Sequence, residues 1–139
     1  MSEAIVTAFS EEEMIAAGRG VGESLEAYSV VALCGQLGAG KTHFSKGLVS
    51  GLGGDDPVTS PTFSLINEYR TARLPIFHFD FYRLEDAAEL PAIGWDEYLD
   101  EEGVVIVEWA DKFPELLPEE TIWFEFQILE SGAHQVVKK

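Results

Sequence analysis

The segment Gly35-Gln36-Leu37-Gly38-Ala39-Gly40-Lys41-Thr42 has the spacing G-x-x-x-x-G-K-T, which is typical of a loop that binds the phosphates of a nucleotide. Glycines let the backbone bend closely around phosphate groups, and the N–H groups of the loop and of a following helix point at the anion. The motif predicts that Lys41 binds phosphate and that the hydroxyl of Thr42 binds Mg²⁺. The rest of the predicted nucleotide-binding set is Gly35, Leu37, Gly38, Ala39 and Gly40.

The residues on either side of this loop predict the elements that would position it. An apolar run over residues 30–34 predicts a strand before the loop. Phe44, Leu48 and Leu52 share one helical face after it, and Gly53-Gly54 predicts the end of that helix. The alternative is a glycine-rich turn with a chance Lys-Thr pair, which does not predict a flanking strand and helix.

A first candidate acid lies in the alternating segment 76–82. A strand there would place its phenylalanines on one face and His78 with Asp80 on the other. Beside a phosphate loop, Asp80 could bind Mg²⁺ directly, hold one of its waters or orient the attacking water. His78 is expected to be a hydrogen-bonding support and not a catalyst. The alternative is a surface strand in which Asp80 pairs with Arg83.

A second candidate acid, Glu108, ends the apolar run 104–107. Such an acid, at the carboxyl edge of a strand, is typical of the Walker-B position that holds Mg²⁺. The alternative is an acid that merely ends a strand, and the spacing does not decide whether Asp80 or Glu108 is the direct metal ligand. Trp109 is predicted to pack beside the site, and the alternative is a core residue. The predicted catalytic residues are Lys41, Asp80 and Glu108.

The loop 59–62 follows the predicted P-loop helix and contains Ser60 and Thr62. A threonine here can sense the γ-phosphate and Mg²⁺, as in nucleotide switches, which makes these two residues a candidate switch loop. The alternative, a turn fixed by Pro61, fits the same residues equally well.

Composition restricts the class of protein. The chain has 139 residues, of which 46% are hydrophobic, and this fits one folded domain over residues 1–139. There is no apolar run long enough for a membrane span and no basic start of a secretory signal. The single cysteine, Cys34, is expected to be a small core residue and not a redox thiol. These features are typical of a cytoplasmic protein.

The charge is strongly acidic. Nine basic residues stand against 25 acidic residues, which gives a net charge of −16. Binding to nucleic acid relies on clustered Lys and Arg, and Lys138-Lys139 are expected to be only a tail, so we expect no strong direct binding to nucleic acid. The acid could be a solvated surface or could attract a basic partner, and the sequence favours the first.

The order of predicted elements indicates an α/β fold, namely a P-loop NTPase-like mixed sheet flanked by helices in a single compact domain. Before the P-loop unit we expect a strand at 4–9 and a helix that starts with the Ser10–Glu13 capping box. After it we expect a hairpin of 63–70 with 74–82 and a helical segment 85–99 broken by Pro91 and Gly94. The chain then continues with a strand at 103–108, a loop or short helix at 110–118 and a last strand at 121–129.

Together these motifs resemble the bacterial TsaE (YjeE) family, the ATPase of tRNA threonylcarbamoyladenosine biosynthesis. The resemblance spans about residues 28–112 and has four parts: the P-loop, Ser60-Pro61-Thr62-Phe63-x-Leu65 with Glu68-Tyr69, His78-x-Asp80-x-Tyr82-Arg83-Leu84, and Val107-Glu108-Trp109. It departs at Gln36, where many members carry an acid, and at His43, where a small hydroxyl residue is common.

The resemblance implies a weak, partner-dependent Mg²⁺-ATPase that joins a TsaD-like transferase and its TsaB-like paralogue. That complex modifies the adenosine beside the anticodon of tRNAs that read ANN codons. The resemblance therefore implies that this chain contacts tRNA only indirectly, through the complex. The matching family positions imply that Lys41 binds phosphate and that Thr42 and Glu108 hold Mg²⁺. They also imply that Asp80 acts on the metal or on the water, and that Thr62 belongs to a switch-like loop. The family also suggests adenine contacts near Ser10 and Gly132.

Three hypotheses remain open at this level. The first is an ATPase whose hydrolysis cycles the transferase complex. The second is a nucleotide-gated scaffold in which no turnover is required. A small-molecule kinase is a weaker third, because the chain lacks room for an acceptor domain, and a GTPase is disfavoured because no N-K-x-D motif occurs.

Overall fold

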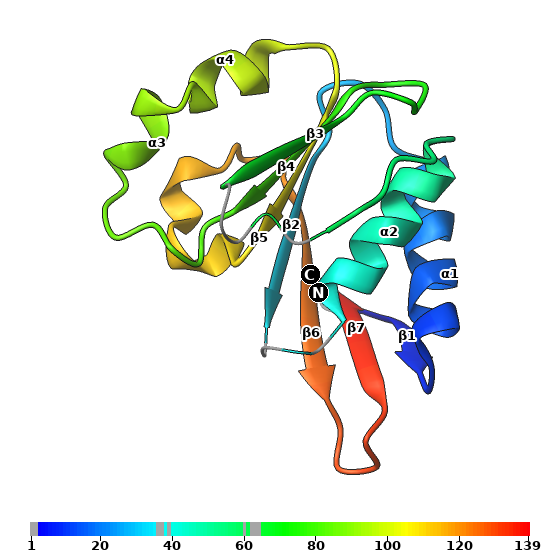
Figure 1. Cartoon of the computed structure of the whole chain (residues 1–139). Helices are drawn as coiled ribbons and strands as arrows, with labels where there is room; N and C mark the ends of the chain where they lie inside the picture. The colour runs from blue at the N-terminus through cyan, green and yellow to red at the C-terminus, as the bar shows by residue number, and fades with distance from the viewer. Residues whose placement is uncertain (1–2, 36–37, 39, 60, 62–64) are drawn as a thin grey trace.

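The computed structural model describes residues 3–35, 38, 40–59, 61 and 65–139. Within these residues, strands form one mixed sheet in the order β1-β7-β6-β2-β5-β4-β3 (Figure 1). The strands are β1 (Glu3–Ala8), β2 (Val30–Gly35), β3 (Ile66–Tyr69), β4 (Ile76–Asp80), β5 (Val104–Glu108), β6 (Ile122–Ile128) and β7 (His134–Lys138).

The middle of the sheet is parallel and its flanks are antiparallel. β6, β2, β5 and β4 run parallel to one another, whereas β3 pairs antiparallel with β4, and β7 pairs antiparallel with both β6 and β1. Parallel strands are covered on both faces, which explains why every residue of β4 and β5 and nearly every residue of β2 is buried, including the polar His78 and Asp80 of β4. The carboxyl ends of these three strands therefore meet at one edge of the sheet.

Helices cover both faces (Figure 1). α1 (Glu11–Glu23) and α2 (Lys41–Gly51) lie on one face, and α3 (Glu89–Ala92), α4 (Trp95–Asp100) and the short 3₁₀ helices η1 (Ala110–Lys112) and η2 (Pro114–Leu116) lie on the other. Each face has its own apolar core: Phe44 and Leu48 of α2 pack on one side, and Trp95 of α4 on the other. No helix of the described part of the chain is long and apolar enough to cross a membrane.

The two helices of the first face approach each other through glycines. A Cβ at Gly18 of α1 would lie 2.2 Å from the carbonyl oxygen of Phe44, and one at Gly47 of α2 would lie 2.1 Å from that of Ile15. Gly22 and Gly51 repeat the contact one turn further along. The glycines of α1 therefore bring this helix against α2, whose first residue is Lys41.

Most of the predicted fold is confirmed. The α/β class, the P-loop strand and helix, the hairpin and the buried strand before Glu108 are present. β4, β5 and β6 are one or two residues shorter than predicted at one or both ends, the first strand spans 3–8 instead of 4–9, and β2 extends to Gly35. Ser10 caps α1 by accepting from the backbone N–H of Glu13, although the Glu13 carboxylate accepts from Phe9 and not from Ser10 itself.

Three predictions are wrong in detail. Pro91 does not break the helical segment, because it occupies the first turn of α3, where a missing N–H costs little; the break is at Gly94. The strand at 122–128 is not the last, since residues 134–138 form β7. Lys138 consequently belongs to a strand and Lys139 pairs with Glu125, so these lysines are not a tail.

Candidate functional site

The P-loop residues that the structure describes form the expected strand–loop–helix unit. Gly35 ends β2 with φ of 129° and a Cβ there would lie 2.1 Å from the carbonyl oxygen of Phe126. Gly40 precedes α2 with φ of 107°, in the left-handed region that favours glycine. Gly38 also lies in this turn, whereas the predicted residues Leu37 and Ala39 fall outside the described residues.

Lys41 is the first residue of α2 and is only 5% exposed. Its ammonium group donates to the carbonyl of Gly35 at 2.9 Å and lies 4.3 Å above the ring of Trp109. Burial lowers the pKa of Lys41 from its ordinary value, and the nearby carboxylates of Glu108 and Asp111 oppose this shift. A buried cation held among carbonyl, ring and carboxylate groups is well placed to meet an anion at the start of α2.

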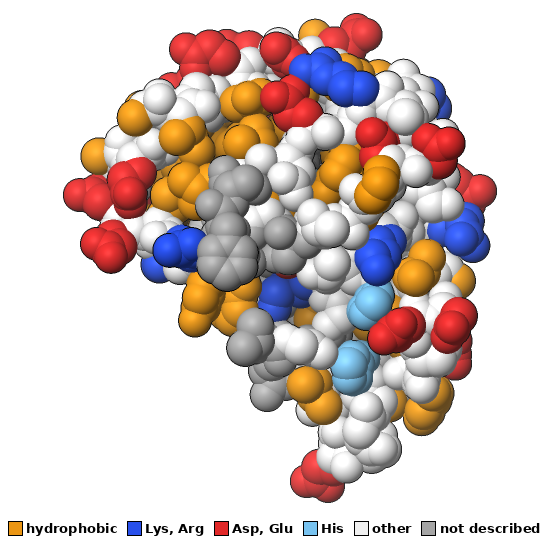
Figure 2. Space-filling view, viewed as in Figure 1, with side chains coloured by type: hydrophobic (Ala, Val, Ile, Leu, Met, Phe, Trp, Pro, Cys, Tyr) orange, Lys and Arg blue, Asp and Glu red, His pale blue; other side chains and the backbone are white. Residues whose placement is uncertain are grey.

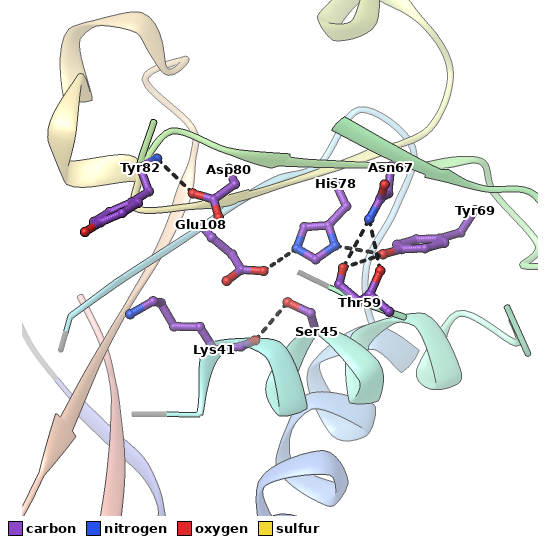
Figure 3. A network of polar contacts seen from close by, with 9 residues as sticks. All are labelled: Lys41, Ser45, Thr59, Asn67, Tyr69, His78, Asp80, Tyr82 and Glu108. Carbon is purple, nitrogen blue, oxygen red and sulfur yellow. Dashed lines mark hydrogen bonds and ion pairs between the residues drawn. The ribbon is translucent and has the colours of Figure 1, made fainter. Parts of the chain in front are cut away.

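Asp80 and Glu108 end adjacent parallel strands at the same register position. They are 1% and 3% exposed. Because alternate residues of β4 and β5 face the core that contains α2, both carboxylates lie on the α2 side of the sheet. Figure 3 shows the Lys41 and Glu108 side chains pointing into the same region between α2 and the ends of these strands. The alternative of a surface strand with an exposed Asp80 is therefore wrong.

Hydrogen bonds fix both carboxylates. Asp80 Oδ1 accepts from the backbone N–H of Tyr82 at 2.8 Å, and Glu108 Oε2 accepts from Nε2 of His78 at 2.6 Å (Figure 3). His78 is fully buried, so it supports Glu108 through a contact that is shielded from bulk water. The structure thus places His78 as a hydrogen-bonding partner of Glu108.

The donor set suits Mg²⁺ better than a softer metal. Within the described residues, no group of three or more His, Cys, Asp and Glu side chains is arranged to hold a metal ion. Mg²⁺ does not need such a cage, because it keeps several waters and takes one or two carboxylates together with substrate phosphates. Asp80, Glu108 and the half-buried Thr42 at the start of α2 provide oxygen ligands of this kind.

A cavity of about 310 Å³ adjoins the P-loop. It brings Ser10 and Gly132, 122 residues apart in the chain, beside Gly38 and Gly40. The Ser10 hydroxyl faces its own helix as the N-cap of α1. The cavity is also lined by Ala8, Phe9, Glu11, Met14, His43 and His134.

Histidines and an acid lie at this cavity. His43 Nε2 lies 3.5 Å from Glu11 Oε1, and His134 comes from β7. In Figure 2 two histidine side chains lie close together beside acidic side chains, while acidic groups recur around the rim of the molecule in this view. Sequence reasoning missed His134 because it missed β7.

The structure describes only some of the remaining predicted site residues. Ser60 and Thr62 of the candidate switch loop lie outside the described residues, which include only Thr59 and Pro61 of that motif. Trp109 is half-buried with φ of 58°, and its ring packs on Tyr82 at 5.0 Å between centroids as well as on Lys41. It thus lies beside the site, as predicted.

The comparisons with known proteins decide the family. The sequence model described as "Threonylcarbamoyl adenosine biosynthesis protein TsaE" matches residues 8–136, which is most of the chain. The chain belongs to the TsaE family. A "tRNA threonylcarbamoyladenosine biosynthesis protein TsaE" of Bacillus subtilis is 50% identical over 93 residues, which are 67% of this chain and 58% of that protein. The TsaE of Treponema pallidum is 41% identical over 119 residues, 86% of this chain and 87% of that protein.

A solved structure supports the same family. The crystal structure of Bacillus subtilis YdiB has a TM-score of 0.83 and 32% identity, covering 99% of this chain and 86% of that chain. The matched segments span 58% and 60% of the Bacillus subtilis and Nostoc TsaE relatives, which is less than two thirds of their length. The family resemblance read from the sequence motifs is thereby confirmed, and the family is one of tRNA threonylcarbamoyladenosine biosynthesis.

The free thiol of Cys34 gives a first prediction. It lies on β2 beside the TsaE-family P-loop, is 5% exposed, and burial together with the negative charge of Asp111 raises its pKa to about 11. At pH 8 the thiolate fraction is then about 100-fold smaller than for a thiol of pKa 9, so alkylation by iodoacetamide should be slowed at least ~100-fold. The control is the same labelling in urea; rapid labelling of the native protein would contradict a buried, inert Cys34.

Proposed function

We propose that this chain is the Mg²⁺-dependent ATPase component of the complex that forms N6-threonylcarbamoyladenosine beside the anticodon of tRNAs reading ANN codons. The observation that carries the proposal is the meeting of Lys41, at the start of α2, with two buried carboxylates that end neighbouring parallel strands. Open α/β sheets bind ligands at this edge, and phosphoryl transfer needs this combination of cation and carboxylates.

In the proposed mechanism each residue has a distinct task. Lys41 binds the β- and γ-phosphates from a position already fixed by the Gly35 carbonyl and the Trp109 ring. Thr42 and Glu108, with Asp80 directly or through water, would hold Mg²⁺, which when bound neutralises phosphate charge. Where Asp80 is not a direct ligand of the metal, its carboxylate would orient the attacking water. The cavity at Ser10 and Gly132 takes the adenine ring.

The partners follow from the family and the charge. We infer that the chain acts in the cytoplasm with a TsaD-like transferase and its TsaB-like paralogue, which carry out the transfer to tRNA. A net charge of −16 opposes direct binding to tRNA, because phosphate groups and this surface repel each other. The same charge supports docking on a basic partner surface. In this scheme ATP hydrolysis cycles the partner complex between rounds of modification.

The second candidate, a nucleotide-gated scaffold, is favoured by the contacts of Thr59. This residue lies just before the candidate switch loop and is held by side chains of β3. Mg-ATP could thus order a docking surface with no turnover required.

Glu108→Gln separates the two candidates. The amide keeps the shape of the side chain and can still accept from His78, but it loses the charge that serves Mg²⁺ or water. We expect nucleotide binding within a few-fold of wild type and turnover lowered about 100-fold, the size of effect seen when one transition-state contact is removed.

The measurement is the number of tRNAs modified per reconstituted complex. The ATPase proposal predicts that complexes with Glu108→Gln carry out the rounds after the first about 100-fold more slowly than wild type. Glu119→Gln, at an exposed site, should continue as wild type does. Many rounds with Glu108→Gln, despite lost hydrolysis, would refute required turnover and support the scaffold.

A further inference from the structure

A chain of polar contacts joins the exposed residue Thr59 to the buried residues Tyr69, His78 and Glu108 (Figure 3). The hydroxyl of Tyr69 lies 3.3 Å from the carbonyl oxygen of Thr59 and 3.0 Å from Nδ1 of His78. On the other side of the ring, Nε2 of His78 lies 2.6 Å from Oε2 of Glu108. Tyr69, His78 and Glu108 are 4%, 0% and 3% exposed, so the contacts of His78 with Tyr69 and Glu108 are shielded from bulk water and strengthened by the low local dielectric. The contact of Tyr69 with the exposed Thr59 is only partly buried.

The chemistry of these groups gives the contacts a direction. The carboxylate of Glu108 only accepts, so Nε2–H of His78 donates to it, and in the neutral ring Nδ1 is then an acceptor. Burial raises the pKa of Tyr69, so its hydroxyl keeps its proton. That single proton faces two acceptors, His78 Nδ1 and the Thr59 carbonyl, and a stronger bond to one weakens the bond to the other.

Thr59 is fixed to β3 by a second side chain as well. The amide of Asn67 donates to the carbonyl oxygen of Thr59 at 3.1 Å and lies 3.4 Å from its Oγ1. Asn67 and Tyr69 are two residues apart on β3, so they share one face, and Asn67 pairs in register with His78 on β4. The backbone immediately before the candidate switch loop is therefore attached to the same face of the sheet on which His78 supports Glu108.

We propose that Tyr69 is a positioning residue that, through His78, couples the orientation of the Glu108 carboxylate to the position of Thr59. This rests on the proposed function, because it is nucleotide binding that would redirect Glu108. A shift of Oε2 changes its bond to His78, the ring responds, and the shared hydroxyl of Tyr69 tightens or releases the Thr59 carbonyl. Tyr69 itself touches neither nucleotide nor metal in this scheme.

Tyr69→Phe tests the coupling because it removes only the hydroxyl and keeps the ring in the core. The probe is a nonhydrolysable ATP analogue with Mg²⁺, and the readout is hydrogen exchange of peptides covering residues 53–59, with the affinity measured in parallel. In the wild type the analogue should slow exchange there. In Tyr69→Phe the affinity should stay within about twofold, the slowing should fall about fivefold, the size of one hydrogen bond, and kcat for ATP should fall with KM unchanged.

The matched control is Tyr98→Phe, which removes a hydroxyl from a half-buried tyrosine that packs on Phe77, on the opposite face of the sheet. It should behave as wild type in every measurement. Full nucleotide-dependent slowing at 53–59 in Tyr69→Phe, or a wild type that binds the analogue without any slowing there, would overturn the coupling and leave the ATPase proposal intact. A wild type that binds neither ATP nor the analogue would overturn both.

Discussion

Lys41→Ala is expected to lower ATP turnover by at least ~100-fold and to weaken Mg-ATP binding strongly. The variant removes the buried ammonium group at the start of α2. In the wild type this group donates to the Gly35 carbonyl and lies above the Trp109 ring. Loss of one preorganised electrostatic contact to a transferring phosphoryl group typically costs this much in rate. The measurements are equilibrium titration with Mg-ATP and phosphate release in the presence of the partner complex.

The fold should survive this change, because burial of the Lys41 ammonium is itself unfavourable for its charged form, as its lowered pKa indicates. Lys46→Ala is the matched control, since Lys46 lies on the same helix, one turn and a half away, and has no place in the site. It should bind and hydrolyse ATP as wild type does. Wild-type turnover by Lys41→Ala would contradict the proposed site, provided that its thermal unfolding shows a folded protein.

Gly18→Ala is expected to destabilise the protein by about 3 kcal/mol, at the upper end of overpacking costs. The new Cβ would lie 2.2 Å from the carbonyl oxygen of Phe44 and 3.0 Å from Cα of Gly47, both backbone atoms that cannot turn aside. α1 and α2 must therefore move apart. Urea unfolding followed by circular dichroism gives the free energy of unfolding directly.

Gly20→Ala provides the control two residues away on the same helix. A Cβ at Gly20 meets nothing within 4 Å, and alanine lowers the entropy of the unfolded chain, so this variant should be stabilised by about 0.5–1 kcal/mol. Opposite signs for the two variants are the expected result. A Gly18→Ala protein as stable as wild type would show that the close approach of α1 and α2 does not contribute to stability.

The parts of the site that sequence patterns could predict are those with a local periodicity. The P-loop spacing, the alternation around Asp80 and the apolar run before Glu108 each encode a strand end or helix start, and the sheet then brings these ends together. Burial of Asp80 was not decided by alternation alone. It follows from the position of β4 between β3 and β5, under α2, which is a tertiary property.

The parts that could not be predicted depend on contacts between distant segments. β7 has only two aliphatic residues, Val136 and Val137, among polar ones, and it is a strand because it pairs with both β6 and β1. Because β7 was not predicted, His134 was not predicted as a residue that lines the cavity. Tyr69 carries no motif of its own, and its role became visible only when β3 placed it between Thr59 and His78.

The central claim, that this family member supports tRNA modification through nucleotide bound at Lys41, is tested most directly in cells. Bacteria depleted of their own TsaE would receive either the wild-type chain or Lys41→Ala at equal expression, and threonylcarbamoyladenosine in their tRNA would be measured by mass spectrometry of nucleosides. The account predicts that the wild type restores the modification and that Lys41→Ala leaves it at the depleted level. Full restoration by Lys41→Ala would contradict the account.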